Sequence, residues 1–130
     1  MLFLLLLSSA MAEARLTEVK VWYYPPAGSP ALVKHWVGEQ LKVDRRFSYS
    51  RLGKFRIRVS CAPADPLAIV FQDELGTRFD LPDSDRKAAG GVKDVYWIVP
   101  YNFKTGLARL QIKAGSDQTP EMTLGTVTAR

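Results

Sequence analysis

Basic side chains gather in one part of the chain, between Lys34 and Arg58. Eight lysines and arginines lie there against two acidic residues, Glu39 and Asp44. Arginine and lysine bind phosphate, sulfate and carboxylate groups, and the planar fork of a guanidinium suits these anions best. The chemistry that the sequence indicates most strongly is therefore the binding of anions.

Three of these cations occupy alternate positions of the segment 54–61, with apolar residues between them. Because a strand sends successive side chains to opposite faces, Lys54, Arg56 and Arg58 form a row on one face of a predicted strand. Arg45 and Arg46 widen this row if they come from a neighbouring strand or its edge. The five residues are the predicted partner-binding surface. The alternative is a solvated outer face that keeps the domain soluble and guards a sheet edge.

Two aromatic residues form a second candidate surface. Trp22 and Tyr24 share the face of Lys20 in the strand predicted for 18–24. If that face is exposed, the two rings and the lysine offer a contact surface for a sugar or a protein. The alternative is that a helix predicted for 30–42 packs over this face, with Trp36 against Trp22, because large aromatic side chains usually fill cores.

The first 14 residues differ from the rest of the chain. The run 2–7 is entirely apolar, and Ala10-Met11-Ala12 and Ala12-Glu13-Ala14 both fit an A-x-A cleavage site. These features are typical of a secretory signal peptide, although no Lys or Arg precedes the apolar run; a buried N-terminal strand is the alternative. We expect cleavage after residue 14, with residues 15–130 in the periplasm or outside the cell. A bilayer span needs about 20 apolar residues, so the protein is not expected to span a membrane.

The charge and the compartment together limit the partners. The formal net charge is +5, which favours acidic partners. We expect a partner protein, or an anionic glycan or lipid of the cell envelope such as lipopolysaccharide or phospholipid head groups. Nucleic acid fits the charge but not an exported protein, so no nucleic-acid partner is expected.

Residues that could support catalysis are few. The sequence has one histidine, His35, and one cysteine, Cys61, and it contains no G-x-S-x-G, H-E-x-x-H or phosphate-binding glycine loop. An enzyme with Cys61 as nucleophile and His35 as base is one hypothesis. However, Cys61 lies on the apolar side of its strand, where a buried thiol is inert. We expect a protein that is not an enzyme and has no cofactor.

Acidic residues cluster between Asp65 and Asp94. Within this region, Asp80-Leu-Pro-Asp83-Ser-Asp85 resembles a loose set of oxygen ligands for calcium. It lacks the glycine and the terminal glutamate of a calcium loop. A small-ligand or calcium-binding protein that uses this loop is the alternative function, whereas a solvated loop without metal is the simpler interpretation.

The rest of the chain reads as short strands separated by turn residues. Strands are predicted at 18–24, 45–51, 54–61, 67–72, 77–81, 92–99, 107–114 and 122–129. Ser29-Pro30 and the apolar spacing after it predict a short helix over 30–42, with a pair of strands as the alternative. The strand 92–99 is apolar on both sides, so we expect it to be central and covered on both faces over part of its length. A long polar loop is predicted for 82–91.

This pattern predicts an antiparallel two-sheet β-sandwich, immunoglobulin-like or transthyretin-like, with a closed barrel as the alternative. The 130 residues suit a single domain after the signal peptide. One cysteine allows no internal disulfide, and Cys61 is expected to be buried. The sequence therefore predicts a non-catalytic exported binding or accessory module with a basic surface.

Overall fold

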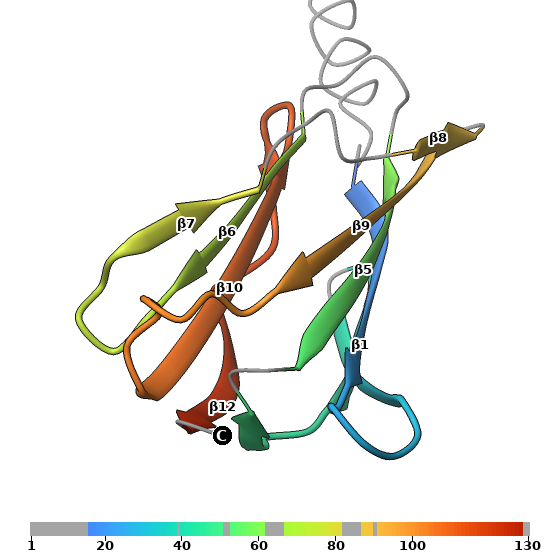
Figure 1. Ribbon diagram of the computed structural model, residues 1–130. Helices are drawn as coiled ribbons and strands as arrows, with labels where there is room; N and C mark the ends of the chain where they lie inside the picture. The colour runs from blue at the N-terminus through green and yellow to red at the C-terminus, as the bar shows by residue number, and fades with distance from the viewer. Residues whose placement is uncertain are drawn as a thin grey trace, which may run out of the picture.

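The computed structural model describes residues 16–38, 40–50, 53–61, 67–81, 87–89 and 91–128. These residues form strands, turns and links, with no helix among them, and Figure 1 shows two sheets that face each other. The all-β prediction is confirmed, and the arrangement is that of a β-sandwich. The signal peptide predicted for residues 1–14 lies outside the described residues. No helix in the described ranges is long and apolar enough to cross a membrane.

The first sheet has the strand order β3-β2-β1-β5-β9-β8, and its neighbouring strands are all antiparallel. Its strands are β1 (Leu16–Tyr24), β2 (Ala31–Val37), β3 (Gln40–Asp44), β5 (Lys54–Cys61), β8 (Lys87–Ala89) and β9 (Val92–Ile98). The strand β5 lies inside the sheet, between β1 and β9, and has the bounds that the sequence predicted.

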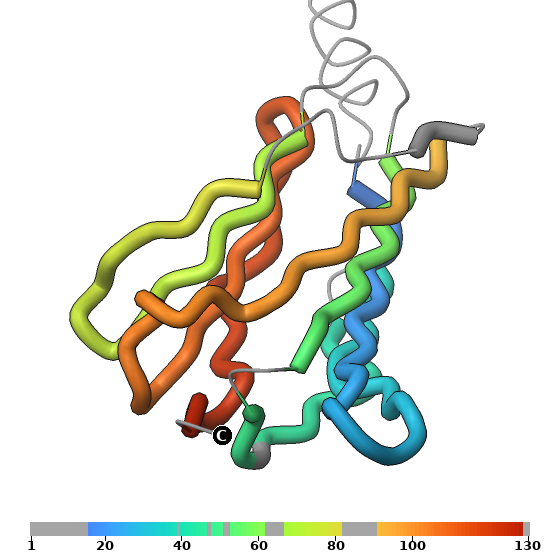
Figure 2. The backbone as a smooth tube through the Cα atoms, in the orientation of Figure 1, coloured from blue at the N-terminus to red at the C-terminus, as the bar shows by residue number. Residues whose placement is uncertain are grey.

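The second sheet has the order β4-β12-β10-β6-β7, with β11 paired to β10. Its strands are β4 (Phe47–Ser50), β6 (Leu67–Gln72), β7 (Arg78–Asp80), β10 (Gly106–Ala114), β11 (Asp117–Gln118) and β12 (Met122–Thr128). Figure 2 shows β4 beside the C-terminal strand β12, and the two run parallel. The prediction of purely antiparallel sheets is therefore wrong for this pair. The reason is that the chain crosses from β3 to the other sheet and enters it next to β12.

The inner face of β5 joins the two sheets. Phe55, Ile57 and Val59 are buried on this face, as the alternation predicted. The ring of Phe55 lies 5.1 Å from that of Tyr49 on β4 and 5.6 Å from that of Phe71 on β6, both in the second sheet. Burying one such side chain contributes about 2–3 kcal/mol. These contacts therefore fix the position of β5 against the second sheet.

The helix predicted for 30–42 is wrong, and the alternative of two strands is correct, since β2 and β3 form a hairpin there. Val21 pairs with Lys34 and Trp22 pairs with Leu32, so Val33 is an extra residue in β2. Such a β-bulge shifts the phase of the alternation. As a result, the buried residues follow a spacing that imitates a helix.

The prediction that 92–99 is covered on both faces is also wrong. On the inner face Val95 is buried and Trp97 stacks on Phe71, with 4.0 Å between ring centroids. On the outer face Tyr96 is 49% exposed and Ile98 is 64% exposed. The two sheets cover only each other's inner faces, and no described segment packs over this side of β9. Part of the polar loop predicted for 82–91 is the short strand β8.

A lysine lies inside the fold beside the bulge. The bulge places both Val33 and Lys34 on the buried side, and Lys34 is 0% exposed. Its ammonium group forms an ion pair with Asp44, its cross-strand neighbour on β3. A buried charge without a partner is far costlier than a buried pair, so Asp44 compensates Lys34.

We predict that Asp44→Ala destabilises the protein by about 3 kcal/mol, because it leaves the Lys34 ammonium buried without its partner carboxylate. The double variant Lys34→Met with Asp44→Ala should recover most of this loss. Urea unfolding followed by circular dichroism measures both free energies of unfolding. If Asp44→Ala is as stable as the wild type, the pair does not compensate the buried charge.

Candidate functional site

The outer face of β5 presents Lys54, Arg56 and Arg58, as the alternation predicted. Each cation is the middle member of a row that crosses β1, β5 and β9. The rows are Tyr24–Lys54–Ile98, Trp22–Arg56–Tyr96 and Lys20–Arg58–Asp94.

The backbone pairing brings these side chains close together. The amide of Val99 donates to the carbonyl of Gly53, and the amide of Cys61 donates to that of Gly91. The hydrogen-bonded pairs of β5 and β9 therefore fall on the inward-facing residues. The outward-facing residues form the non-hydrogen-bonded pairs, where side chains across two strands approach most closely.

All three cations lie over aromatic rings of the neighbouring strands. Lys54 Nζ is 5.2 Å from the ring centroid of Tyr24 and 5.0 Å from that of Tyr96. Arg56 Cζ is 4.9 Å from the ring of Trp22 and 5.7 Å from that of Tyr96. Arg58 Cζ is 5.7 Å from the ring of Trp22. Such cation–π contacts contribute about 0.5–1 kcal/mol each at exposed sites. We call Trp22, Tyr24, Lys54, Arg56, Arg58 and Tyr96 the cation–aromatic ladder.

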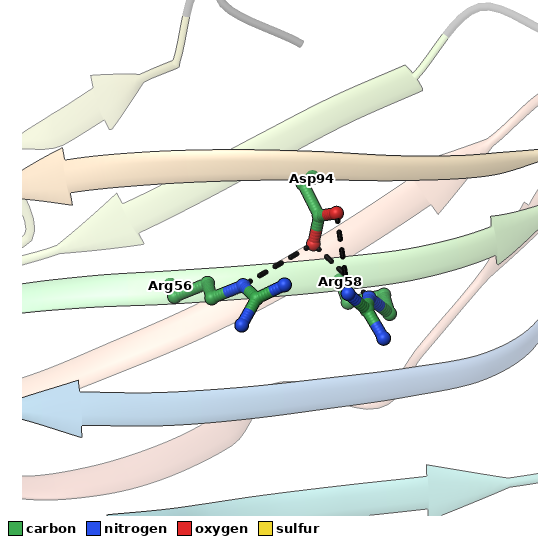
Figure 3. A network of polar contacts seen from close by, with 3 residues as sticks. All are labelled: Arg56, Arg58 and Asp94. Atoms are coloured by element: carbon green, nitrogen blue, oxygen red, sulfur yellow. Dashed lines mark hydrogen bonds and ion pairs between the residues drawn. The ribbon is translucent and has the colours of Figure 1, made fainter. Parts of the chain in front are cut away.

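One carboxylate, that of Asp94 on β9, bridges the two arginines of the ladder (Figure 3). Arg58 Nε donates to Asp94 Oδ1 at 3.1 Å, and its Nη2 donates to Oδ2 at 3.5 Å. Arg56 Nε lies 3.4 Å from the same Oδ1 in an ion pair. The bridge orients both guanidinium groups and lowers their mutual repulsion.

Arg56 is the more enclosed of the two arginines, with 23% of its side chain exposed against 39% for Arg58. Burial alone would lower the pKa of Arg56, but a hydrogen bond with Tyr24 and the charge of Asp94 outweigh this effect. The pKa of Arg56 is therefore raised above its ordinary value. Arg56 stays cationic, which a permanent anion-binding group requires.

The structure brings Trp22 and Tyr24 into the ladder, so the two surfaces that the sequence predicted separately are one. The predicted covering of Trp22 by Trp36 is wrong. Trp36 pairs with Val19, whose side chain is buried, and Trp36 itself is buried on that inner face. Trp22 lies on the outer face instead, beside Arg56.

Arg45 and Arg46 do not join the ladder. They link β3 to β4, and β2 and β1 separate β3 from β5. Arg46 lies 3.9 Å from Asp44, the last residue of β3. The structure thus places these two predicted site residues at the far edge of the first sheet.

Sequence reasoning missed Tyr96 and Asp94 as members of the site. Both share one side of their strand with Ile98, and this alternation was visible in the sequence. The pairing of β9 with β5 and the register of that pairing were not visible in the sequence. Only the register shows that Tyr96 lies opposite Arg56 and Asp94 opposite Arg58.

His35 and Cys61 do not form a catalytic pair. His35 pairs with Lys20 on the outer face, and its Nε2 lies 2.6 Å from Glu18 Oε2. Cys61 is buried and belongs to the inward-facing residues of β5. The two side chains therefore project from opposite faces of the first sheet, where a base cannot reach the thiol.

The acidic region contains no metal cluster in the described ranges, where no three His, Cys, Asp or Glu side chains gather. Asp73 is buried and accepts hydrogen bonds from the amides of Leu75, Thr77 and Lys104, so it holds a turn together. Asp80 forms an ion pair with Arg78 at 3.2 Å. Residues 82–85 of the predicted calcium loop, which include Asp83 and Asp85, lie outside the described residues.

The sequence matches no protein-family model and no curated protein. The function is therefore inferred from the chemistry of the cation–aromatic ladder.

We predict that the thiol of Cys61 stays unmodified by an aromatic disulfide reagent while the protein is folded, because the side chain is only 7% exposed. The same reagent should modify it fully in denaturant. Absorbance of the released thiolate measures both reactions. Rapid modification of the folded protein would restore Cys61 as a candidate nucleophile.

Proposed function

We propose that the protein is a non-catalytic, exported binding or accessory module that contacts a partner protein or an anionic component of the cell envelope through the cation–aromatic ladder. The observation that supports this proposal is the position of Lys54, Arg56 and Arg58, held over aromatic rings on a sheet face that no described segment covers.

The charge balance of this face favours an anionic partner. The ladder has three cations, and Asp94 is the carboxylate that pairs with its arginines. Arginine keeps in-plane N–H donors available while its face rests on a ring, so it can bind an anion and stay stacked. Long side chains also lose about 1.5–2 kcal/mol of rotamer freedom when fixed. The contacts within the ladder meet part of this cost before a partner arrives.

Export and the finer fold class belong to the same proposal. The apolar run at residues 2–7 and the A-x-A sites after it support secretion to the periplasm or beyond. The two facing sheets, with a crossing from β3 to β4, support an immunoglobulin-like or transthyretin-like sandwich.

We predict that Arg56→Glu with Arg58→Glu lowers binding to isolated cell envelopes at least about tenfold, because it replaces attraction with repulsion at the ladder. Cosedimentation of the labelled protein with envelopes, at low and at physiological salt, measures this binding. Wild-type binding should weaken as salt rises, since exposed charges are screened over about 10 Å at 0.1 M.

The matched control is Arg78→Glu with Lys113→Glu. These residues are exposed on β7 and β10 of the second sheet, and the double change alters the net charge equally. The control should bind like the wild type. Equal loss of binding in both double variants would mean that net charge alone attracts the protein, and no loss in the first would exclude the ladder.

A further inference from the structure

The cations change what the aromatic rings of the ladder can offer a ligand. Trp22 has two arginines over its ring, and Tyr96 has Lys54 and Arg56 over its ring. Rings engaged in this way are poor stacking platforms for the apolar face of a sugar. The guanidinium groups, in contrast, keep terminal N–H donors that Asp94 does not use, and such donors bind carboxylates.

The spacing of the cations matches one kind of anionic chain. Lys54, Arg56 and Arg58 occupy alternate positions of one strand, so neighbouring cations are separated by the rise of two residues, about 6.6–6.8 Å. An extended polypeptide laid along β5 repeats its alternate side chains at the same interval. Carboxylates at every second position would then meet the successive cations in register.

The exposed side chains of β9 favour a protein partner over a simple polyanion. Tyr96 and Ile98 are exposed on β9, directly opposite Arg56 and Lys54. Trp, Tyr and Arg are also the residue types that dominate the binding energy of protein interfaces. Exposed apolar surface beside cations can bind a polypeptide segment that carries both acidic and apolar side chains.

Asp94 shows that the space between the two arginines accepts a carboxylate. Its Oδ1 lies 3.1 Å from Arg58 Nε and 3.4 Å from Arg56 Nε. This bridge approaches from β9 and uses the Nε atoms and one terminal nitrogen of Arg58. We infer that the ladder binds an extended acidic segment of a partner protein, with Asp or Glu at alternate positions and an apolar side chain against the exposed Ile98. This inference rests on the proposed function of the ladder and narrows its partner to a protein.

The test uses two synthetic peptides of ten residues and identical composition. One has four Glu and a terminal Val at every second position, so that all five face β5, with Thr between them; the other has the same four glutamates in one continuous block. In an extended block, half of the carboxylates point away from β5. Fluorescence anisotropy with the full chain should show about tenfold tighter binding of the alternating peptide, which corresponds to about 1.4 kcal/mol.

The double variant Arg56→Lys with Arg58→Lys tests whether the ladder binds carboxylates through the planar guanidinium groups or through positive charge alone. This variant keeps the positive charge but lacks the planar fork, so its affinity for the alternating peptide should fall about tenfold. Circular dichroism checks that the variant is folded. Equal affinity of the variant and the wild type would overturn recognition by the guanidinium forks.

Two further probes separate this inference from the proposed function. Polygalacturonate and vesicles containing anionic phospholipid should bind more weakly than the alternating peptide. Tighter binding of either probe, lost in Arg56→Glu with Arg58→Glu, would overturn the inference but leave the ladder as the binding face. If that variant binds every probe like the wild type, both the inference and the proposed function fail.

Discussion

The strand β5 is paired on both sides, and its side chains alternate between two faces with a period of two residues. This alternation determines both the core contacts and the outer surface of the first sheet. β5 must bury one face to join the two sheets, and Phe55, Ile57 and Val59 occupy that face. The alternate residues of β5 are then forced outward, and three of them, Lys54, Arg56 and Arg58, are cations. Like charges in a row repel each other, so the outer face needs compensation from its neighbours. The aromatic side chains of β1 and β9 and the carboxylate of Asp94 supply it.

The core and the ladder are two sides of the same strands. Tyr23 lies on the inner face of β1, and its ring is 5.1 Å from that of Phe55. Its chain neighbours Trp22 and Tyr24 lie on the outer face of β1. Tyr23 also accepts a hydrogen bond from the amide of Ser50, which ties β1 to β4 in the second sheet. The register that packs the core therefore also places the rings opposite the cations. A shift of one residue would move these cations into the core without partner carboxylates, which is strongly destabilising.

Local sequence pattern was sufficient where the alternation was regular and insufficient where tertiary structure disturbed it. The strict alternation of 54–61 predicted the bounds of β5, its buried face and its row of cations. In β2 the extra residue Val33 breaks the alternation, and the resulting spacing imitated a helix. The alternation of β9 was readable, but whether a layer covers its outer face depends on the packing of the sheets. For the same reason, neither the exposure of Tyr96 nor the pairing of Asp94 with Arg58 could be derived from the sequence.

The same contacts bear on specificity as well as stability. Three unshielded cations on a flat sheet would attract any polyanion, because such attraction depends on charge more than on shape. Asp94 reduces the net charge of the face and contacts the Nε atoms of Arg56 and Arg58, so fewer guanidinium donors remain for a ligand. Specificity is a difference between affinities, so lowering the general attraction favours ligands that meet the remaining donors in the correct geometry. A carboxylate that reaches the remaining terminal nitrogens of a guanidinium group gains hydrogen bonds as well as charge attraction. Under the proposed function, the ladder would combine a weaker general attraction with a greater selectivity for carboxylates.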